Sequence, residues 1–134
     1  MNAKELVDFL IEKKILRREE LKGCSEKEID DLEIHFGHKF PKAFREFLSQ
    51  LGHNAGNFRR GTKYLYKDLF TITDYTRTTL EDGPFKLPLD AFVFSAHQGY
   101  IFAYFLFSDG DDPPIYTYME HEPQSEKWAN NFSE

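Results

Sequence analysis

The sequence lacks a second cysteine and any long apolar segment. Cys24 is the single cysteine among 134 residues, so no disulfide can form within the chain, as is typical of a reducing compartment. No run of about 18 apolar residues is present, and charged side chains already appear at Lys4, Glu5 and Asp8. These absences argue against a membrane span and a secretory signal. We therefore expect a cytoplasmic protein.

Motifs for catalysis, cofactors and metals are missing as well. No serine lies in a glycine-flanked elbow, and the glycines form no phosphate-binding loop. His35 and His38 are three residues apart, but Gly37 should end a helix between them. The run from Asp109 to Asp112 resembles part of a calcium loop, yet Pro113 occupies a ligand position and no glutamate closes the loop. We therefore expect no catalytic residue, no metal and no cofactor.

Cys24 has no activating base nearby in the sequence. It lies between Gly23 and Ser25, next to an expected helix N-terminus, where the pKa of a thiol can fall. A packing role is the interpretation that we favour. The alternative is an enzyme of an unrecognised type, with Cys24, His97 or the acidic segment around Asp111 in acid-base work.

Basic residues are almost absent from the second part of the chain. Residues 81–134 contain two of them, Lys86 and Lys127, against ten acidic residues, whereas residues 1–80 contain 15 basic and 13 acidic residues. Such an acidic region repels phosphates and anionic lipid and attracts a basic protein. We therefore expect a protein partner, without nucleic-acid or membrane binding. The alternative is that the charge serves solubility alone.

Aromatic side chains are abundant, and the chain has the length of a single domain, residues 1–134, with 14 Phe and 7 Tyr. Helical periodicity marks three segments, one from Leu6 to Leu16, then residues 26–36 and 41–51, and it is weak in the threonine-rich residues 64–80. Strand-like patterns follow at residues 92–95, 100–107 and 115–119. This order predicts an α+β domain, with N-terminal helices packed on a mainly antiparallel β-sheet formed by the C-terminal half.

The segment from Gly23 to Leu51 carries the strongest pattern, two capped helices in succession. Ser25 is a candidate N-cap, and Glu28, three residues on, completes a capping box. Gly37 is a left-handed terminator, and Pro41 suits the first turn of the next helix. The apolar positions at helical spacing are Ile29, Leu32 and Phe36, then Phe44, Phe47, Leu48 and Leu51.

This succession resembles the SUKH superfamily of Smi/Knr-like domains. That pattern has a leucine-glutamate pair, a glycine, an apolar-proline pair and an aromatic-rich helix; here these are Leu32-Glu33, Gly37, Phe40-Pro41 and Phe44 to Leu48. The segments that resemble its second half are Leu87-Pro88, Phe92-Val93-Phe94, His97-Gln98-Gly99-Tyr100, Asp111-Asp112-Pro113-Pro114 and Ile115-Tyr116. Six residues carry the structural motif: Ser25, Glu28, Glu33, Gly37, Pro41 and Gly99.

The resemblance implies a helix over the threonine-rich residues 64–80 and a function in protein binding. Bacterial members that resemble this sequence are largely immunity proteins, which neutralise the toxin domain of a polymorphic or contact-dependent toxin in the cytoplasm. On this basis we expect a cognate toxin partner, a basic protein such as a nuclease, bound by direct contact. The residues expected to form or border the toxin-facing surface are His97, Gln98, Tyr100, Asp109, Asp111, Asp112, Glu120 and Glu122.

Several alternatives stay open. The chief one is a regulatory protein-interaction scaffold of the Smi/Knr type with no toxin partner. Within the candidate surface, the alternative to recognition is that Gly99 serves a turn and Tyr100 packs in the core, and we favour this alternative. Trp128 either anchors a partner or pins the C-terminal tail to the domain, and we favour the tail. Self-association is also left open.

Overall fold

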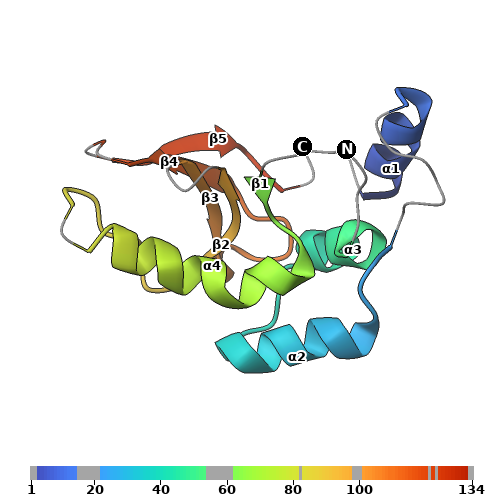
Figure 1. The fold of residues 1–134 in the computed structure, drawn as a ribbon, viewed down its shortest axis with the longest axis horizontal. Helices are drawn as coiled ribbons and strands as arrows, with labels where there is room; N and C mark the ends of the chain where they lie inside the picture. The colour runs from blue at the N-terminus through green and yellow to red at the C-terminus, as the bar shows by residue number, and fades with distance from the viewer. Residues whose placement is uncertain are drawn as a thin grey trace.

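The computed structural model describes residues 3–14, 22–53, 62–81, 83–97, 101–120, 122 and 124–132. The helices are α1 (Ala3–Glu12), α2 (Glu26–Phe36), α3 (Lys42–Leu51) and α4 (Tyr66–Thr79). The strands are β1 (Thr62–Lys63), β2 (Ala91–His97), β3 (Ile101–Leu106), β4 (Ile115–Met119) and β5 (Glu126–Ala129), with the short 3₁₀ helix η2 (Phe107–Asp109) after β3. In Figure 1, α2, α3 and α4 lie together along one side of a curved sheet. The predicted α+β class is confirmed.

The sheet is an antiparallel meander in the order β1-β2-β3-β4-β5. β2 and β3 pair from Ala91 with Leu106 to His97 with Ile101, and a bulge interrupts the register between Val93 and Ser95. The antiparallel hairpin predicted here is confirmed. Strands β2, β3, β4 and β5 pair in chain order. The connections between them therefore alternate between the two ends of the sheet.

Neither edge strand was expected from the sequence pattern. β1 has two residues, comes between α3 and α4, and pairs Thr62 with His97. β5 contains Glu126 and Lys127, both exposed, and shows no alternation of buried and exposed residues. An edge strand pairs on one side only and lies partly in solvent, so it needs little apolar content. Periodicity therefore gives only a weak signal for such strands.

The threonine-rich helix α4 lies against the edge of β2. Thr73 and Thr76 are buried on its inner face. The Thr76 hydroxyl donates to the carbonyl oxygen of Ile72 at 2.8 Å, one turn earlier, while the Thr73 hydroxyl accepts from the N–H of Val93 at 3.0 Å. The β-branched residues that weaken the helical signal therefore bond to the helix's own backbone and to the strand beside it. Among the described helices, none is long and apolar enough to span a membrane.

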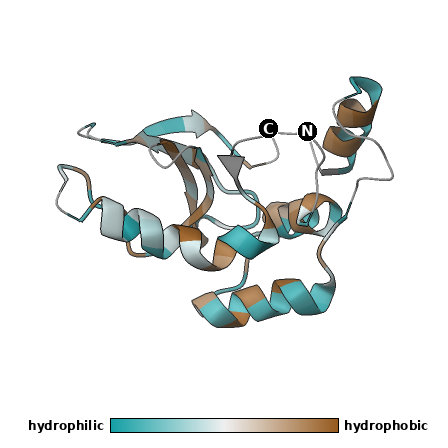
Figure 2. Ribbon diagram, in the orientation of Figure 1, coloured by the Kyte–Doolittle hydropathy of each residue, from teal (hydrophilic) through white to brown (hydrophobic). Residues whose placement is uncertain are grey.

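Phenylalanine rings fill the space between the helices and the sheet. Phe44 on α3 is fully buried, and its ring centroid lies 5.2 Å from that of Phe40 and 5.3 Å from that of Phe105. Four further rings surround it: Phe47, Phe92, Phe94 and Phe132. Edge-to-face and tilted pairs of this kind add about 0.5–1.5 kcal/mol each beyond the area they bury. Figure 2 shows the hydrophobic central strands on which this core rests.

The C-terminal tail is held by Phe132 rather than by Trp128. The Phe132 ring packs edge-to-face on Phe44 and Phe94, at centroid distances of 5.5 and 5.3 Å. Trp128 is 62 % exposed. The preference for Trp128 as the residue that pins the tail is therefore wrong. The indole on an edge strand is left open to solvent, and the smaller apolar ring fills the core.

Glu33 is a buried carboxylate that joins three parts of the helical layer. Its Oε2 accepts from the N–H of Phe40 at 2.6 Å, and its Oε1 lies 2.7 Å from Nη1 of Arg45 on α3. Its carbonyl oxygen accepts from the N–H of Gly37, which has φ of 71° and ends α2 in the left-handed conformation. One residue thus fixes the end of α2, the path into Phe40-Pro41 and the position of α3.

Removing this carboxylate should destabilise the domain. For Glu33→Ala we expect a loss of about 2–4 kcal/mol in the free energy of unfolding, because a buried N–H and a guanidinium lose their acceptor. Urea denaturation measures the loss. Asp30→Ala is the matched control, since Asp30 is exposed and contacts the same Arg45 at 3.4 Å, so its cost should stay below about 0.5 kcal/mol. Equal losses for both variants would contradict this account of Glu33.

Candidate functional site

The residues predicted to face a partner fall into two groups. The first group lies at the end of β2 and just after β4, and we call it the hairpin end: His97, Glu120 and Glu122. The second group leaves β3 through η2, and we call it the aspartate loop: Asp109, Asp111 and Asp112. Gln98, Gly99 and Tyr100 lie outside the described residues, so the choice between recognition and packing for Tyr100 stays a prediction.

Strand register places the two groups at opposite ends of the sheet. His97 pairs with Ile101, and Ile101 pairs with Met119, so the hairpin end lies at this end. At the other end Ala91 pairs with Leu106, and the aspartate loop begins just beyond. The six residues of β3, at about 3.3 Å per residue, separate the ends by about 20 Å. The predicted surface therefore consists of two separate surfaces, and partner binding by either one stays a prediction.

The aspartate loop also completes the start of α3. The N-cap residue Pro41 provides no side-chain acceptor for the first N–H groups of the helix. The carbonyl oxygen of Asp111 accepts from the N–H of Ala43 at 3.0 Å instead. The three aspartates are exposed, whereas Pro113 after them is buried and anchors the loop. Carboxylates beside a helix N-terminus are favoured by its dipole, so the loop can carry its charge at low cost in stability.

A strongly exposed apolar residue adjoins this loop. Leu89 is 94 % exposed. The next residue, Asp90, accepts from the hydroxyl of Ser108 at 2.6 Å and from its N–H at 3.3 Å. The pKa of Asp90 is held below its usual value by these bonds, and the bond from the Ser108 hydroxyl has the largest effect. They fix the segment of Leu89 against η2, next to Asp109. An exposed apolar side chain and exposed acidic ones therefore lie at the same end of the sheet.

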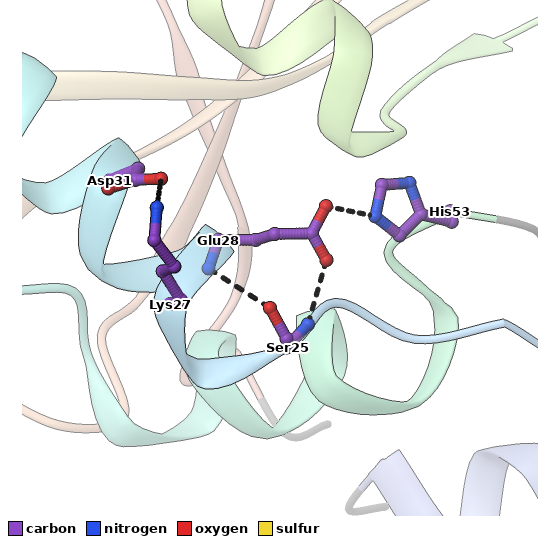
Figure 3. A network of polar contacts seen from close by, with 5 residues as sticks. All are labelled: Ser25, Lys27, Glu28, Asp31 and His53. Atoms are coloured by element: carbon purple, nitrogen blue, oxygen red, sulfur yellow. Dashed lines mark hydrogen bonds and ion pairs between the residues drawn. The ribbon is translucent and has the colours of Figure 1, made fainter.

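A second polar cluster lies at the start of α2, as Figure 3 shows. Ser25 and Glu28 form the predicted capping box: the N–H of Glu28 donates to Ser25 Oγ at 3.2 Å, and the N–H of Ser25 donates to Glu28 Oε1 at 2.9 Å. Glu28 Oε2 lies 2.7 Å from Nε2 of His53. The hydrogen bond from the Ser25 backbone, and then the His53 imidazole, lower the pKa of Glu28 despite some desolvation. This cluster ties the first turn of α2 to the residue just after α3.

The thiol of Cys24 lies in the same cluster. Its Sγ, a carboxylate oxygen of Glu28 and a ring nitrogen of His53 all lie within 4.8 Å of one another. Burial, assisted by the Glu28 carboxylate, raises the pKa of the Cys24 thiol to about 12. The thiol is therefore protonated at neutral pH and is a poor nucleophile. The enzymatic alternative has its best geometry here, and the protonation of the thiol weighs against it.

Sequence reasoning treated Cys24 and Glu28 separately and missed His53. Glu28 and His53 are 25 residues apart, and α3 intervenes. A signal was nevertheless available, because two helices joined by a short connection commonly run antiparallel and bring the start of the first beside the end of the second. The structure has this arrangement: the N–H of Cys24 donates to the carbonyl oxygen of Leu48 at 2.8 Å, and that of His53 donates to Lys22 at 2.9 Å.

The lowered pKa of Glu28 makes stability depend on pH. A carboxyl group whose pKa is lowered by folding stabilises the protein above its unfolded pKa, about 4.3, and loses this contribution as the pH falls through the folded value. We expect Glu28→Gln to be less stable than the wild type at pH 7 and the difference to shrink steadily between about pH 5 and pH 3. Urea denaturation over this range measures it. A difference that stays constant with pH would show that the ionised carboxylate of Glu28 does not contribute to stability.

Comparison with known protein families gives a match over most of the chain. The model of the SMI1 / KNR4 family (SUKH-1) matches residues 23–134, which include α2 to β5 and exclude α1. No curated protein matches the sequence. The match begins at Gly23, directly before the capping box, and contains the Glu33 and Phe40-Pro41 contacts described above. The predicted resemblance is confirmed, and the chain belongs to the SMI1 / KNR4 family (SUKH-1).

Proposed function

We propose that this chain is an immunity protein, which binds and neutralises a cognate bacterial toxin of the polymorphic or contact-dependent kind by direct protein–protein contact. The family includes toxin immunity proteins. Neutralisation by binding requires a preformed surface that complements the toxin, rather than a reactive group. The aspartate loop with Leu89 fits this requirement.

The observation that carries the proposal is the acidic character of this surface and the hydrogen bonds that hold it. Three exposed aspartates project from a loop that is bonded to α3 and to Asp90. A loop held in this way loses little conformational entropy when a partner binds. Its negative charge accelerates the encounter with a basic protein. Leu89 adds an apolar side chain that a partner pocket would bury.

A nuclease toxin accounts best for the charge. The active site of a nuclease binds phosphates, so it is basic, and carboxylates can occupy the positions of phosphates. Residues 81–134, which contain the whole sheet except β1, hold ten acidic residues and two basic ones. We place the interaction in the cytoplasm, where such a toxin would act.

Co-expression tests the proposal directly. The toxin domain encoded beside this gene is expressed in a sensitive bacterium with and without the chain, and the two proteins are then purified together. We expect rescue of growth and a stoichiometric complex. Rescue without a complex would contradict neutralisation by direct contact. Neither rescue nor a complex, with the chain shown to be folded, would favour the regulatory scaffold.

Charge reversal distinguishes the two ends of the sheet. We expect Asp109→Lys with Asp111→Lys to slow association with the toxin by about tenfold or more at low salt, with a smaller effect at high salt. The N–H of Ala43 donates to the backbone carbonyl oxygen of Asp111, so this hydrogen bond is retained when the side chain is changed. Association is followed by stopped-flow fluorescence or surface plasmon resonance.

Two variants with the same change in net charge serve as controls. Glu120→Lys with Glu122→Lys changes the hairpin end, and Glu46→Lys with Asp74→Lys changes exposed positions on α3 and α4. Both should associate at close to the wild-type rate. An equal loss in all three variants would show that net charge alone steers the encounter. A loss confined to Glu120 and Glu122 would move the interface to the hairpin end.

A further inference from the structure

We propose that Cys24, Glu28 and His53 form a three-ligand site for a divalent transition metal, with Zn²⁺ as the cation that fits best. Thiolate sulfur, carboxylate oxygen and imidazole nitrogen are the three donor types that proteins use for zinc. Here Cys24 lies just before α2, Glu28 lies in its first turn, and His53 lies just after α3. This site is distinct from the aspartate loop and does not depend on the toxin.

The donor atoms are near enough to one another for a single ion to bind all three after small side-chain movements. Bonds of about 2.0–2.3 Å in a tetrahedral site place neighbouring donors about 3.3–3.8 Å apart. Glu28 Oε2 and His53 Nε2 are 2.7 Å apart, and all three donors lie within 4.8 Å of one another. Small rotations of the His53 and Cys24 side chains would let an ion enter between them. The direct contact of Glu28 with His53 would then become a contact through the metal.

Backbone hydrogen bonds hold the three ligands independently of any ion. The N–H of Cys24 donates to Leu48 O at 2.8 Å, and the N–H of His53 donates to Lys22 O at 2.9 Å. Glu28 is fixed through Oε1 by the Ser25 N–H, which leaves Oε2 for a metal. Gly52 permits the close approach of the thiol, because a Cβ at this position would lie 2.2 Å from Cys24 Sγ. The ligands are thus positioned in advance, as a functional metal site requires.

Charge and access agree with this assignment. The side chains of His53 and Glu28 are 25 % and 33 % exposed, so an ion has a path from solvent to the otherwise buried thiol. A thiolate and a carboxylate together balance the two positive charges of the ion, and a bound metal deprotonates a thiol ligand. Three protein ligands leave one position for water. Such a metal would clamp the start of α2 to the end of α3.

Cobalt titration of the untagged, reduced protein tests the site. Co²⁺ bound by a thiolate in tetrahedral geometry gives charge-transfer absorption in the near ultraviolet and visible d–d bands. We expect both at one equivalent of Co²⁺, and their loss when Zn²⁺ is added. Zn²⁺ should also raise the unfolding temperature in a concentration-dependent manner, because an ion that binds only the folded state stabilises it.

Substitutions assign the ligands. Cys24→Ser should abolish the charge-transfer band, and His53→Gln, which keeps a polar side chain beside Glu28, should weaken binding by at least about tenfold. His35→Gln is the matched control, because His35 is an exposed histidine on α2 whose ring contacts are with Phe36 and Phe70. It should bind as the wild type does. Binding without a thiolate band, or binding that survives both Cys24→Ser and His53→Gln, would overturn the proposal.

Discussion

The carboxylate of Glu33 is the contact on which the rest of this domain depends. It is buried, yet it accepts from a backbone N–H and an arginine at once, so its desolvation is offset by two charge-assisted bonds. Through the Phe40 N–H it directs the chain from α2 into the aromatic core, where the Phe40 ring meets Phe44 and Phe92. The helical layer is therefore aligned with the sheet by a polar contact and stabilised by apolar ones.

The parts of the fold that could be predicted are those determined over a few residues. The capping box of Ser25 and Glu28, the terminator Gly37 and the β2–β3 hairpin all rest on local bonds or short loops, and all are present. The expectation of α4 rests on the family resemblance, because its threonines obscure the helical periodicity. Its buried threonines bond to backbone groups, one of them in β2. No local pattern could reveal the partner in β2.

The features that escaped prediction depend on contacts between distant segments. β1 and β5 are edge strands with little apolar content. The choice of Phe132 over Trp128 as the tail anchor depends on the shape of a core to which α3, β2 and β3 contribute. The approach of His53 to Glu28 follows from the antiparallel arrangement of α2 and α3. The arrangement of the candidate site also depends on contacts between distant segments. Its acidic residues were identified by composition, but only strand register could divide them between the two ends of the sheet.

The bond from Ala43 to Asp111 connects the two halves of the molecule at one point. It joins the first turn of a helix in the aromatic core to the loop that carries the exposed aspartates. The amide proton of Ala43 is thus an internal reporter of that loop. Its exchange with solvent deuterium requires the loop to separate from α3, so the exchange rate measures how often the acidic surface loses its shape. A protein bound to the loop would slow this exchange at Ala43, inside the helical layer, without touching the helix itself.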